Sequence, residues 1–495
     1  MPDSRVRLPV EPILQLLGHF QPSTIRYNRR VFVNRNLRMK NIQAIGFDMD
    51  YTLAIYKPEF DRLVWDLTLT RLVSDGGFPT EVKTFKYDPE FAVRGLVIDM
   101  VRGNIVKMDR HRHVSRVYHG TRAVDDDTRR TLYRRGRIHL SRPTLALIDT
   151  LFHVPETHVF AQMVDLLDSR GEGDAGTYRH AYQVIRETVD DLHRDGSLKR
   201  EVMMDLGRYI VDDPEIAYTL ERLVYSGKRL FLATNSGWLY SDAVMSYLLN
   251  GRLASFPRWT DYFQHIIVEA TKPDFFSQRS PLKPEENAQA DIAHKVFRNG
   301  NLRGLEGLLN TSGEAILYIG DHIYGDILRS KKSSAWRTAM IIPEMENELA
   351  AVEMAREDQL TLERLFTKRR NLEIETNYLQ RLLASLLGVD ELVPAECNSS
   401  ANPVLAVADA SEKNIAATRQ ALDTLEIRER AVLERLAGQF NQRWGPLFKE
   451  GNGHSIFGEQ VEAWACIYTS RVTNFLSYSP IQYFRAPPDL LPHER

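Results

Sequence analysis

The sequence predicts an α/β fold with a doubly wound, mostly parallel sheet. Three short apolar runs lack the polar alternation of half-exposed strands: IQAIGFDMD at 42–50, GKRLFLATNS at 227–236 and EAILYIGDHIYGDI at 314–327. Such runs are typical of strands buried on both faces. A helical pattern, IAYTLERLVYSG at 216–227, precedes the second run and ends at a glycine. This strand–helix–strand order favours a parallel sheet, in which ligands bind beyond the carboxyl ends of the strands.

The size and composition of the chain favour a soluble protein of more than one domain. Its 495 residues exceed the ~100–200 residues of a single domain. Lys plus Arg total 64 and Asp plus Glu total 66, so no global charge attracts nucleic acid or a membrane surface. The only cysteines, Cys397 and Cys466, have no metal-type spacing and favour a reducing compartment. With no signal-peptide pattern and no apolar stretch near ~20 residues, we expect a cytoplasmic protein.

The gap between the first and second predicted strands is far longer than a simple crossover requires. We therefore expect an inserted α+β cap domain at 57–211 and a discontinuous catalytic core at 1–56 and 212–345. The first part of the insert alternates in polarity and predicts hairpins. The stretches at 144–169 and 178–200 have helical periodicity.

Residues 346–495 are expected to form a C-terminal helical region that packs on the core. Charged helical patterns at 347–388 and 410–440 flank a loop-like stretch at 389–409. Two long helices joined by a loop favour an antiparallel hairpin. The periodicity alone is equally consistent with helices that simply cover the core.

Asp48 and Asp50 follow the first predicted strand in a D-x-D-x-T pattern that ends at Thr52. An apolar setting disfavours ionised carboxylates unless a cation or hydrogen bonds compensate. One carboxylate at a strand end can attack phosphorus and form an aspartyl-phosphate. The other can protonate the leaving oxygen and later accept a proton from water. The alternative interpretation is a helix N-cap, where Asp and Thr are common.

Polar residues of a second strand end and a later lysine suit a phosphate group. Thr234, Asn235 and Ser236 end the second predicted strand, and their hydroxyl and amide groups can bind phosphate oxygens without adding charge. Lys272 supplies a compact positive charge that can stabilise a phosphoryl group in transfer. Taken singly, the first group is equally explained as a cap or turn, and the lysine as a solvated surface residue.

Asp321 and Asp326 follow the third predicted strand, next to glycines that permit tight turns. Together with Asp48 they would crowd negative charge at one edge of the sheet. A divalent cation relieves this repulsion, and hard oxygen ligands with a phosphate select Mg²⁺. An Asp/Gly turn is the alternative for this motif alone. The order of all these motifs along separate strand ends predicts a metal-dependent phosphohydrolase.

At these residues the sequence resembles the haloacid dehalogenase superfamily of phosphohydrolases. Longer segments resemble the cytosolic purine 5′-nucleotidase family in order along nearly the whole chain. They are GFDMDYTLAIYK, LFHVPETHVFAQMVDLLD, VDDLHRDGSLK, FLATNS, YIGDHIYGDILRSKK, WRTAMIIPE and YFRAPPDLLPHE. DMDYTLA and GDHIYGDIL are the most specific of these motifs.

The resemblance implies roles for the strand-end residues. Asp48 would be the nucleophile, Asp50 the acid/base and a backbone-carbonyl ligand of Mg²⁺, and Asp321 the second carboxylate on the metal. Asp326 would support the water shell of the metal. The phosphate would be held by Thr234, Asn235, Ser236 and Lys272, with Lys199 as a further phosphate-side lysine.

The resemblance also implies a purine-binding set in the cap. Phe152 and His193 would enclose the base, with Arg186 and Asp190 reading its edge, and His153 stands where relatives tend to carry Asn. The spacing agrees independently, because i, i+4 and i+7 positions share one helical face. An Arg–Asp pair suits a 6-oxopurine and favours IMP and GMP. An i,i+4 surface salt bridge is the alternative from spacing alone.

The expected function is therefore Mg²⁺-dependent hydrolysis of purine nucleoside 5′-monophosphates. An aspartyl-phosphate intermediate also permits transfer of the phosphoryl group to a nucleoside. Family members form dimers and tetramers, so a homo-oligomer is an expected partner state, with neither nucleic acid nor a membrane as partner. Two alternatives remain: a phosphatase of the same fold for another ester, and a catalytically retired scaffold acting through its charged helices.

Overall fold

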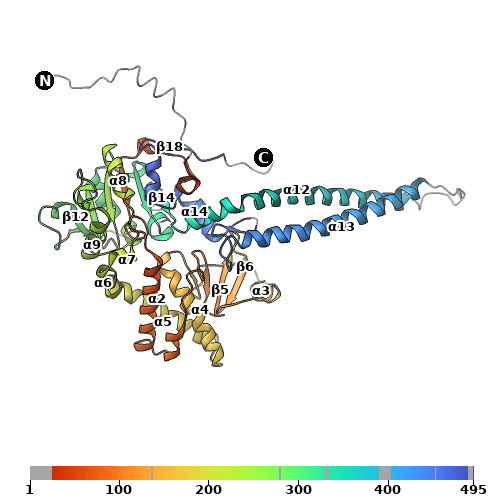
Figure 1. Ribbon diagram of the computed structural model, residues 1–495, viewed down its shortest axis with the longest axis horizontal. Helices are drawn as coiled ribbons and strands as arrows, with labels where there is room; N and C mark the ends of the chain where they lie inside the picture. Colours follow the sequence, from red (N-terminus) through yellow and green to blue (C-terminus); the bar gives the residue numbers. More distant parts are fainter. Residues whose placement is uncertain are drawn as a thin grey trace, which may run out of the picture.

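A large mixed α/β sheet forms the centre of the computed structural model (Figure 1). The structure describes residues 25–134, 138–277, 280–328, 334–389, 403–451, 453–488 and 494. Within these residues the sheet has nine strands. In spatial order they are β1 (Phe32–Val33), β17 (Ile467–Thr469), β14 (Arg337–Ile341), β13 (Ile316–Gly320), β3 (Ala44–Phe47), β9 (Arg229–Ala233), β10 (His265–Val268), β12 (Val296–Asn299) and β11 (Leu282–Pro284).

The three strands expected from the apolar runs are β3, β9 and β13, and they lie side by side at the centre of the sheet. β3 pairs in parallel with both β13 and β9. The parallel pairing continues through β14 to β17 on one side and through β10 to β12 on the other. Only the edge strands β1 and β11 are antiparallel among the strands of this sheet. The carboxyl ends of the central strands therefore meet at one edge, as predicted.

Both faces of the central strands are buried by helices. Along β9, Leu230 and Leu232 belong to one apolar cluster, whereas Phe231 and Ala233 belong to another. Helices α8 (Glu215–Tyr225) and α9 (Trp238–Leu249) supply residues to the first cluster, and α10 (Leu302–Leu309) supplies the second. This two-sided burial explains why the strand sequences show no polar alternation.

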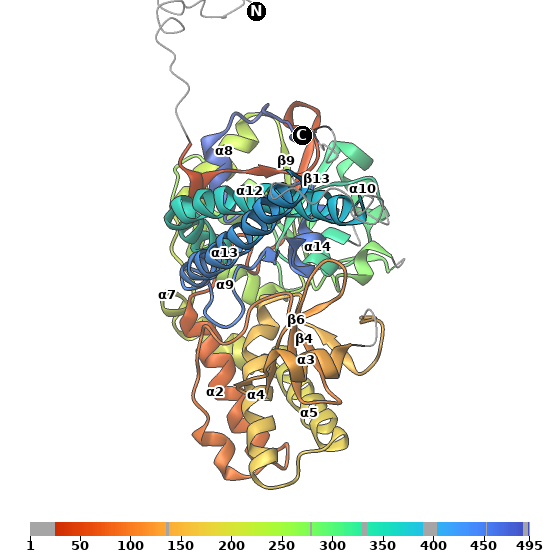
Figure 2. The ribbon, with the colours of Figure 1, turned by 90° about the vertical axis from the view of Figure 1, so that its right-hand side faces the viewer.

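A second, antiparallel sheet and its helices occupy most of residues 57–211. Figure 2 shows this layer below the large sheet. Its strands run in the order β7 (Arg122–Ala123), β6 (Val114–His119), β5 (Asn104–Met108), β4 (Val97–Asp99) and β8 (Leu145–Leu147). Its helices are α2 (Pro58–Ser74), α3 (Asp126–Tyr133), α4 (Val154–Ser169), α5 (Ala175–Arg194), α6 (Ser197–Met204) and α7 (Leu206–Tyr209).

One prediction within this layer was wrong. The sequence pattern favoured a helix from residue 144 onward, but α4 begins only at Val154. Residues 145–147 instead form β8, which pairs with β4. The short Leu-Ala-Leu run does not itself distinguish a strand from a helix, and the available edge of β4 decides between them.

Two long helices extend away from the sheets (Figure 1). They are α12 (Met345–Val389) and α13 (Pro403–Ala437). Arg435 pairs with Asp358 near the base, and Thr376 bonds Thr418 farther along, so the helices are antiparallel. The hairpin interpretation is thus confirmed. The loop expected at 389–409 is shorter, because α13 already begins at Pro403, and residues 390–402 lie outside the described part of the chain.

The end of the chain also contributes to the large sheet, which the sequence did not predict. β17 inserts between β1 and β14, and α14 (Ile456–Trp464) precedes it. Two small ribbons pair β15 (Lys449–Glu450) with β16 (Gly453–His454) and β18 (Tyr483–Phe484) with β2 (Leu37–Arg38).

A π-helix, η9 (Ile323–Leu328), follows β13. The short 3-10 helices are η1 (Tyr27–Arg29), η2 (Met39–Asn41), η3 (Thr80–Thr84), η4 (Leu151–His153), η5 (Trp259–Tyr262), η6 (Asp274–Phe276), η7 (Ala293–Lys295), η8 (Gly313–Ala315) and η11 (Val472–Ser477). No helix in the described ranges has both the length and the apolar character needed to cross a membrane.

Replacing Phe231 tests the packing beneath the site. Its ring is fully buried and lies against Tyr318 and Trp336. Phe231→Ala should lower the free energy of unfolding by ~3–5 kcal/mol, because it removes apolar contacts and leaves a cavity. The control Leu239→Ala, at a side chain 72% exposed, should change it by less than about 0.5 kcal/mol. Urea denaturation measures both, and equal effects would contradict the described packing.

Candidate active site

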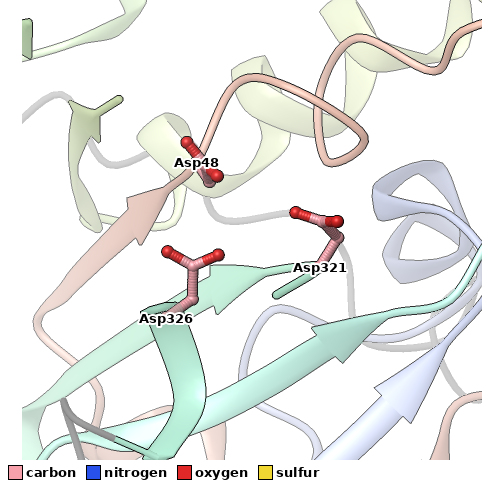
Figure 3. Close-up of side chains that lie close together, drawn as sticks. All are labelled: Asp48, Asp321 and Asp326. Carbon is pink, nitrogen blue, oxygen red and sulfur yellow. The ribbon is translucent and has the colours of Figure 1, made fainter. Parts of the chain in front are cut away.

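Three buried carboxylates converge at the carboxyl end of the central strands. Asp48 directly follows β3, and Asp321 directly follows β13. Each of Asp48, Asp321 and Asp326 offers an oxygen within 4.8 Å of those of the other two. Figure 3 shows the three side chains facing one another. The prediction that carboxylates from separate strand ends come together is therefore confirmed.

The ammonium group of Lys272 pairs with two of these carboxylates. Its Nζ lies 2.8 Å from Asp48 Oδ1 and 2.7 Å from Asp326 Oδ1. It also donates to the hydroxyl of Tyr318 at 3.0 Å. Burial opposes the ammonium charge, but Asp326 and Asp48 together raise the pKa of Lys272 well above its ordinary value. Lys272 therefore stays charged and offsets part of the negative charge of the cluster.

Asn235 fixes the backbone that carries Lys272. Asn235 Nδ2 donates to Lys272 O at 3.0 Å, and Lys272 N donates to Asn235 Oδ1 at 2.6 Å. Thr271 has a φ of 53°, a conformation rarely adopted by non-glycine residues and common near functional sites. This reciprocal pair holds the lysine segment against the end of β9. Thr234 stabilises the turn that carries Asn235 after β9, because its Oγ1 accepts a hydrogen bond from Ser236 N at 3.1 Å.

Asp326 reaches the cluster because of the π-helix that follows β13. Asp326 Oδ2 accepts from His322 N at 3.2 Å, which turns the carboxylate back toward the strand end. The turn brings Asp326 directly against Gly320. A Cβ on Gly320 would lie 2.6 Å from Asp326 Cγ, so no larger residue fits without displacing the carboxylate. π-helical turns of this kind recur at functional sites.

The carboxylate of Asp321 is suited to act as a metal ligand. Its Oδ2 is buried and has no hydrogen-bond partner among the residues that the structure describes. Burial, reinforced by Asp326, raises the pKa of Asp321 to about 7, and burial also raises the pKa of Asp48. A buried, unsatisfied carboxylate is costly unless a cation pairs with it. Asp48, Asp321 and Asp326 thus form an acidic triad that could bind a metal.

Asp50 lies apart from the triad and is held by neutral hydroxyl donors. Tyr56 donates to Asp50 Oδ1 at 2.6 Å, and Ser236 Oγ donates to Asp50 Oδ2 at 2.8 Å. The hydroxyls of Tyr56 and Tyr240 are 2.8 Å apart. These bonds hold the carboxylate of Asp50 in a fixed orientation. Tyr51, the next residue, has a φ of 53°, which turns the chain sharply after the acid.

Two adjoining cavities open above these carboxylates. One, of about 260 Å³, is lined by the acidic triad, Lys272 and Asp50. The other, of about 350 Å³, extends from Asp50 toward Lys199 and Tyr240. They share Asp50, Phe152, Asp190, His193 and Asn235. The two cavities therefore form one site that runs from the strand ends to the helices of the second layer.

The structure brings most of the expected base-binding residues to this site. Phe152, His153, Asp190 and His193 line the cavities. Phe152 and His193 are in edge-to-face contact, with ring centroids 5.1 Å apart and planes at 80°. Because the two rings contact each other, they do not enclose a space for a purine between them as the sequence analysis expected. Burial lowers the pKa of His193 to about 4 and that of His153 to about 3, so both rings are neutral near pH 7.

Lys199 lines one of the two cavities, whereas Arg186 lines neither of them. Lys199 lines the larger cavity with its Nζ 5.3 Å from the ring centre of Tyr240. Arg186 instead donates to the fully buried Glu156 at 3.1 Å, and Tyr182 donates to the same carboxylate. The structure thus pairs Arg186 with a residue on α4 and does not place it among those that line either cavity.

Sequence reasoning missed several residues that hold the site together. Tyr56 and Tyr240 orient Asp50, Tyr318 contacts Lys272, and Glu156 pairs with Arg186. Arg94 donates to the carbonyl oxygen of Asp321 at 2.8 Å. Tyr56 lies within a motif singled out in the sequence, six residues after Asp50. Glu156 and Tyr318 also lie within motifs quoted from the sequence, whereas Tyr240 and Arg94 do not. For these four residues no local pattern indicates the contact, because their partners are distant in the chain.

The arrangement has the parts that phosphoryl transfer requires. It combines a carboxylate at a strand end, a second acid nearby, a lysine and an acidic triad suited to a cation. A parallel α/β sheet with these groups at its carboxyl edge defines a phosphohydrolase-type site.

Comparisons with known proteins agree with this class. Residues 31–495 match the model of the 5' nucleotidase family. A 5'-nucleotidase domain-containing protein of Dictyostelium discoideum is 28% identical over 480 residues, covering 94% of this chain and 74% of that protein. The rat 5'-nucleotidase domain-containing protein 2 is 29% identical over 342 residues, which cover 65% of this chain and 60% of the rat protein. The chain belongs to the 5' nucleotidase family and is a phosphoric monoester hydrolase.

Gly320→Ala tests the close approach of Asp326 to the strand end. The added methyl group would displace Asp326, and kcat/KM should fall by about 100-fold because the cluster loses its geometry. Gly307→Ala is the matched control, since no atom lies within 4 Å of its Cβ position. Steady-state phosphate release measures both variants. Wild-type activity in Gly320→Ala would show that the position of Asp326 is unimportant.

Proposed function

We propose that this protein is a Mg²⁺-dependent 5′-nucleotidase that hydrolyses purine nucleoside 5′-monophosphates, with IMP and GMP preferred, to nucleoside and phosphate. One observation carries the proposal: the acidic triad, whose oxygens lie within 4.8 Å of one another, opens into a cavity that continues to Phe152 and His193. A phosphate on the triad would leave its nucleoside directed at these rings. Family membership supports the same activity.

Asp48 is the proposed nucleophile. Both of its contacts, with Lys272 and with Met49 N at 2.8 Å, use Oδ1, so we expect Oδ2 to attack phosphorus. The P–O5′ bond then breaks, and Asp50 protonates the leaving nucleoside oxygen. In the second step Asp50 accepts a proton from water as that water attacks the aspartyl-phosphate. Phosphate leaves and the Asp48 carboxylate is restored.

The triad would hold Mg²⁺. Carboxylate oxygens are hard ligands, and Mg²⁺ is commonly bound by one or two carboxylates together with substrate phosphate and water. The unpaired Oδ2 of Asp321 and the charge of Asp48 and Asp326, only partly offset by Lys272, support this assignment. When bound, the ion supplies charge stabilisation for the transferring phosphoryl group. Lys272, Asn235 and Ser236 would complete the phosphate site, with Thr234 supporting their turn and Lys199 on the nucleotide side.

The purine would bind between the cavities, against Phe152 and His193. Nε2 of His193 is buried and has no hydrogen-bond partner within the described part of the chain, so it offers a contact to a polar atom of the base. Asp190 lines both cavities and can accept a hydrogen bond from an N–H group of a 6-oxopurine. Arg186 would support Asp190 from its pair with Glu156, and His153 would lie at the sugar or base. This arrangement supports a preference for IMP and GMP.

The two sheets would then have separate roles. We propose that residues 1–56 and 212–345 form a haloacid-dehalogenase-like catalytic core and that 57–211 form a cap that recognises the nucleotide. The boundary-crossing cavity supports this division, since Phe152 and His193 come from the second layer and Asp48 from the first. The C-terminal region 346–495 would complete the core through β17. The aspartyl-phosphate would also allow transfer to a nucleoside hydroxyl, and the assembly would be a homo-oligomer.

Asp48→Asn tests the covalent mechanism. The amide keeps the shape of the carboxylate but cannot form the aspartyl-phosphate. Phosphate release from IMP should therefore fall by at least about a thousandfold. Brief incubation with ³²P-labelled IMP followed by acid quenching should label the wild-type protein and leave the variant unlabelled. Turnover retained in Asp48→Asn would remove the covalent mechanism.

A substrate panel tests the base assignment. With Mg²⁺ present, kcat/KM for IMP and GMP should exceed that for AMP and CMP by about tenfold or more, since a site built to hydrogen-bond one edge rejects the others. Asp190→Asn should reduce this preference. The matched control is Asp191→Asn, because the neighbouring side chain is 54% exposed and pairs with Arg194. Equal turnover of sugar phosphates would favour a phosphatase with another substrate.

A further inference from the structure

Arg94 connects three parts of the molecule that are far apart in the sequence. It lies just before β4, and its side chain is completely buried. Its Nη1 donates to the carbonyl oxygen of Asp321 at 2.8 Å. Its Nε and Nη2 donate to the two carboxylate oxygens of Glu344 at 2.6 and 2.7 Å. The guanidinium carbon also lies 5.0 Å from the centre of the Phe457 ring.

The bonds of Arg94 leave little freedom to Asp321. A buried guanidinium needs a charged partner and good hydrogen-bond geometry, and the bidentate bond to Glu344 supplies both. With the guanidinium plane fixed in this way, Nη1 is placed to donate to Asp321 O. The carbonyl bond restrains the peptide that follows Asp321 and hence the direction of its carboxylate, whose buried Oδ2 has no hydrogen-bond partner among the described residues.

Glu344 also links the site to the helical hairpin. It immediately precedes α12, whose residues Met345 and Leu349 pack in one cluster with Ile323 and Ile327. Those two isoleucines belong to η9, the π-helix that carries Asp326. The start of α12 therefore packs against the segment that carries Asp326, and Glu344 is linked through Arg94 to Asp321. A second clamp, Arg471 with Glu346, holds the first turn of α12, and Arg471 also pairs with Asp213 rather than with Asp321.

We propose that Arg94 is a positioning residue for the metal carboxylates. It fixes Asp321 through the carbonyl bond, and Glu344 holds the guanidinium in the orientation that this bond requires. The inference rests on the proposed metal site and goes beyond it, because it assigns a role to a residue that contacts neither metal nor substrate. A purely structural arginine would instead affect stability without a specific effect on metal binding.

Mn²⁺ binding to the full-length protein, without substrate, tests this role. The electron paramagnetic resonance signal of free Mn²⁺ gives Kd directly, separately from catalysis. Arg94→Lys retains the charge but cannot make the bidentate bond and the carbonyl bond together. We expect its Kd for Mn²⁺ to rise by about tenfold or more, as is typical when a partner of a metal ligand is lost. Glu344→Gln, which keeps the shape of the side chain, should weaken binding in the same direction and serves if Arg94→Lys does not fold.

The matched control is Arg471→Lys, which loosens the other clamp on α12. It should lower the melting temperature as Arg94→Lys does but leave the Kd for Mn²⁺ unchanged. Folded Arg94→Lys and Glu344→Gln variants that bind Mn²⁺ like the wild type would overturn the inference, as would an equal loss of binding in Arg471→Lys. If instead Asp321→Asn binds Mn²⁺ as tightly as the wild type, the proposed metal site itself is wrong, and the inference fails with it.

Discussion

The structure depends on keeping three carboxylates together in a buried place. Asp48, Asp321 and Asp326 would repel one another strongly at the end of an apolar sheet, and Lys272 supplies only one compensating charge. The protein tolerates this arrangement because Lys272 bridges two of the three and because a cation can satisfy the unpaired oxygen of Asp321. The negative charge that Lys272 does not offset makes the site suitable for a metal ion, and a bound metal ion would in turn attract a phosphate.

The fold places the three carboxylates in a cavity that is also lined by residues of the second layer. Parallel strands buried on both faces hold Asp48 and Asp321 at neighbouring strand ends, and the reciprocal bonds of Asn235 hold Lys272 beside them. The second layer then places Phe152 over the same cavity. Under the proposed function, phosphate chemistry and base recognition would come from different layers.

The central strands and their polar ends were predictable, because apolar runs and strand-end aspartates are local features and parallel strands share an edge. Asp48 and Asp321 therefore came together as expected. The edge-to-face contact of Phe152 with His193, the pairing of Arg186 with Glu156 and the insertion of β17 into the sheet depend on distant partners. No sequence period reports such contacts. For the same reason the buried Arg94, in a segment without regular structure, gave no signal.

The most direct test of the account is a crystal of the protein soaked in Mn²⁺, with anomalous diffraction recorded at the manganese edge. If the acidic triad binds a metal, we expect one strong anomalous peak between the carboxylates of Asp48 and Asp321, at coordination distance from both, with Lys272 still paired to Asp48. A fully soaked crystal with no peak among these side chains, or with manganese bound only at a remote surface, would contradict it.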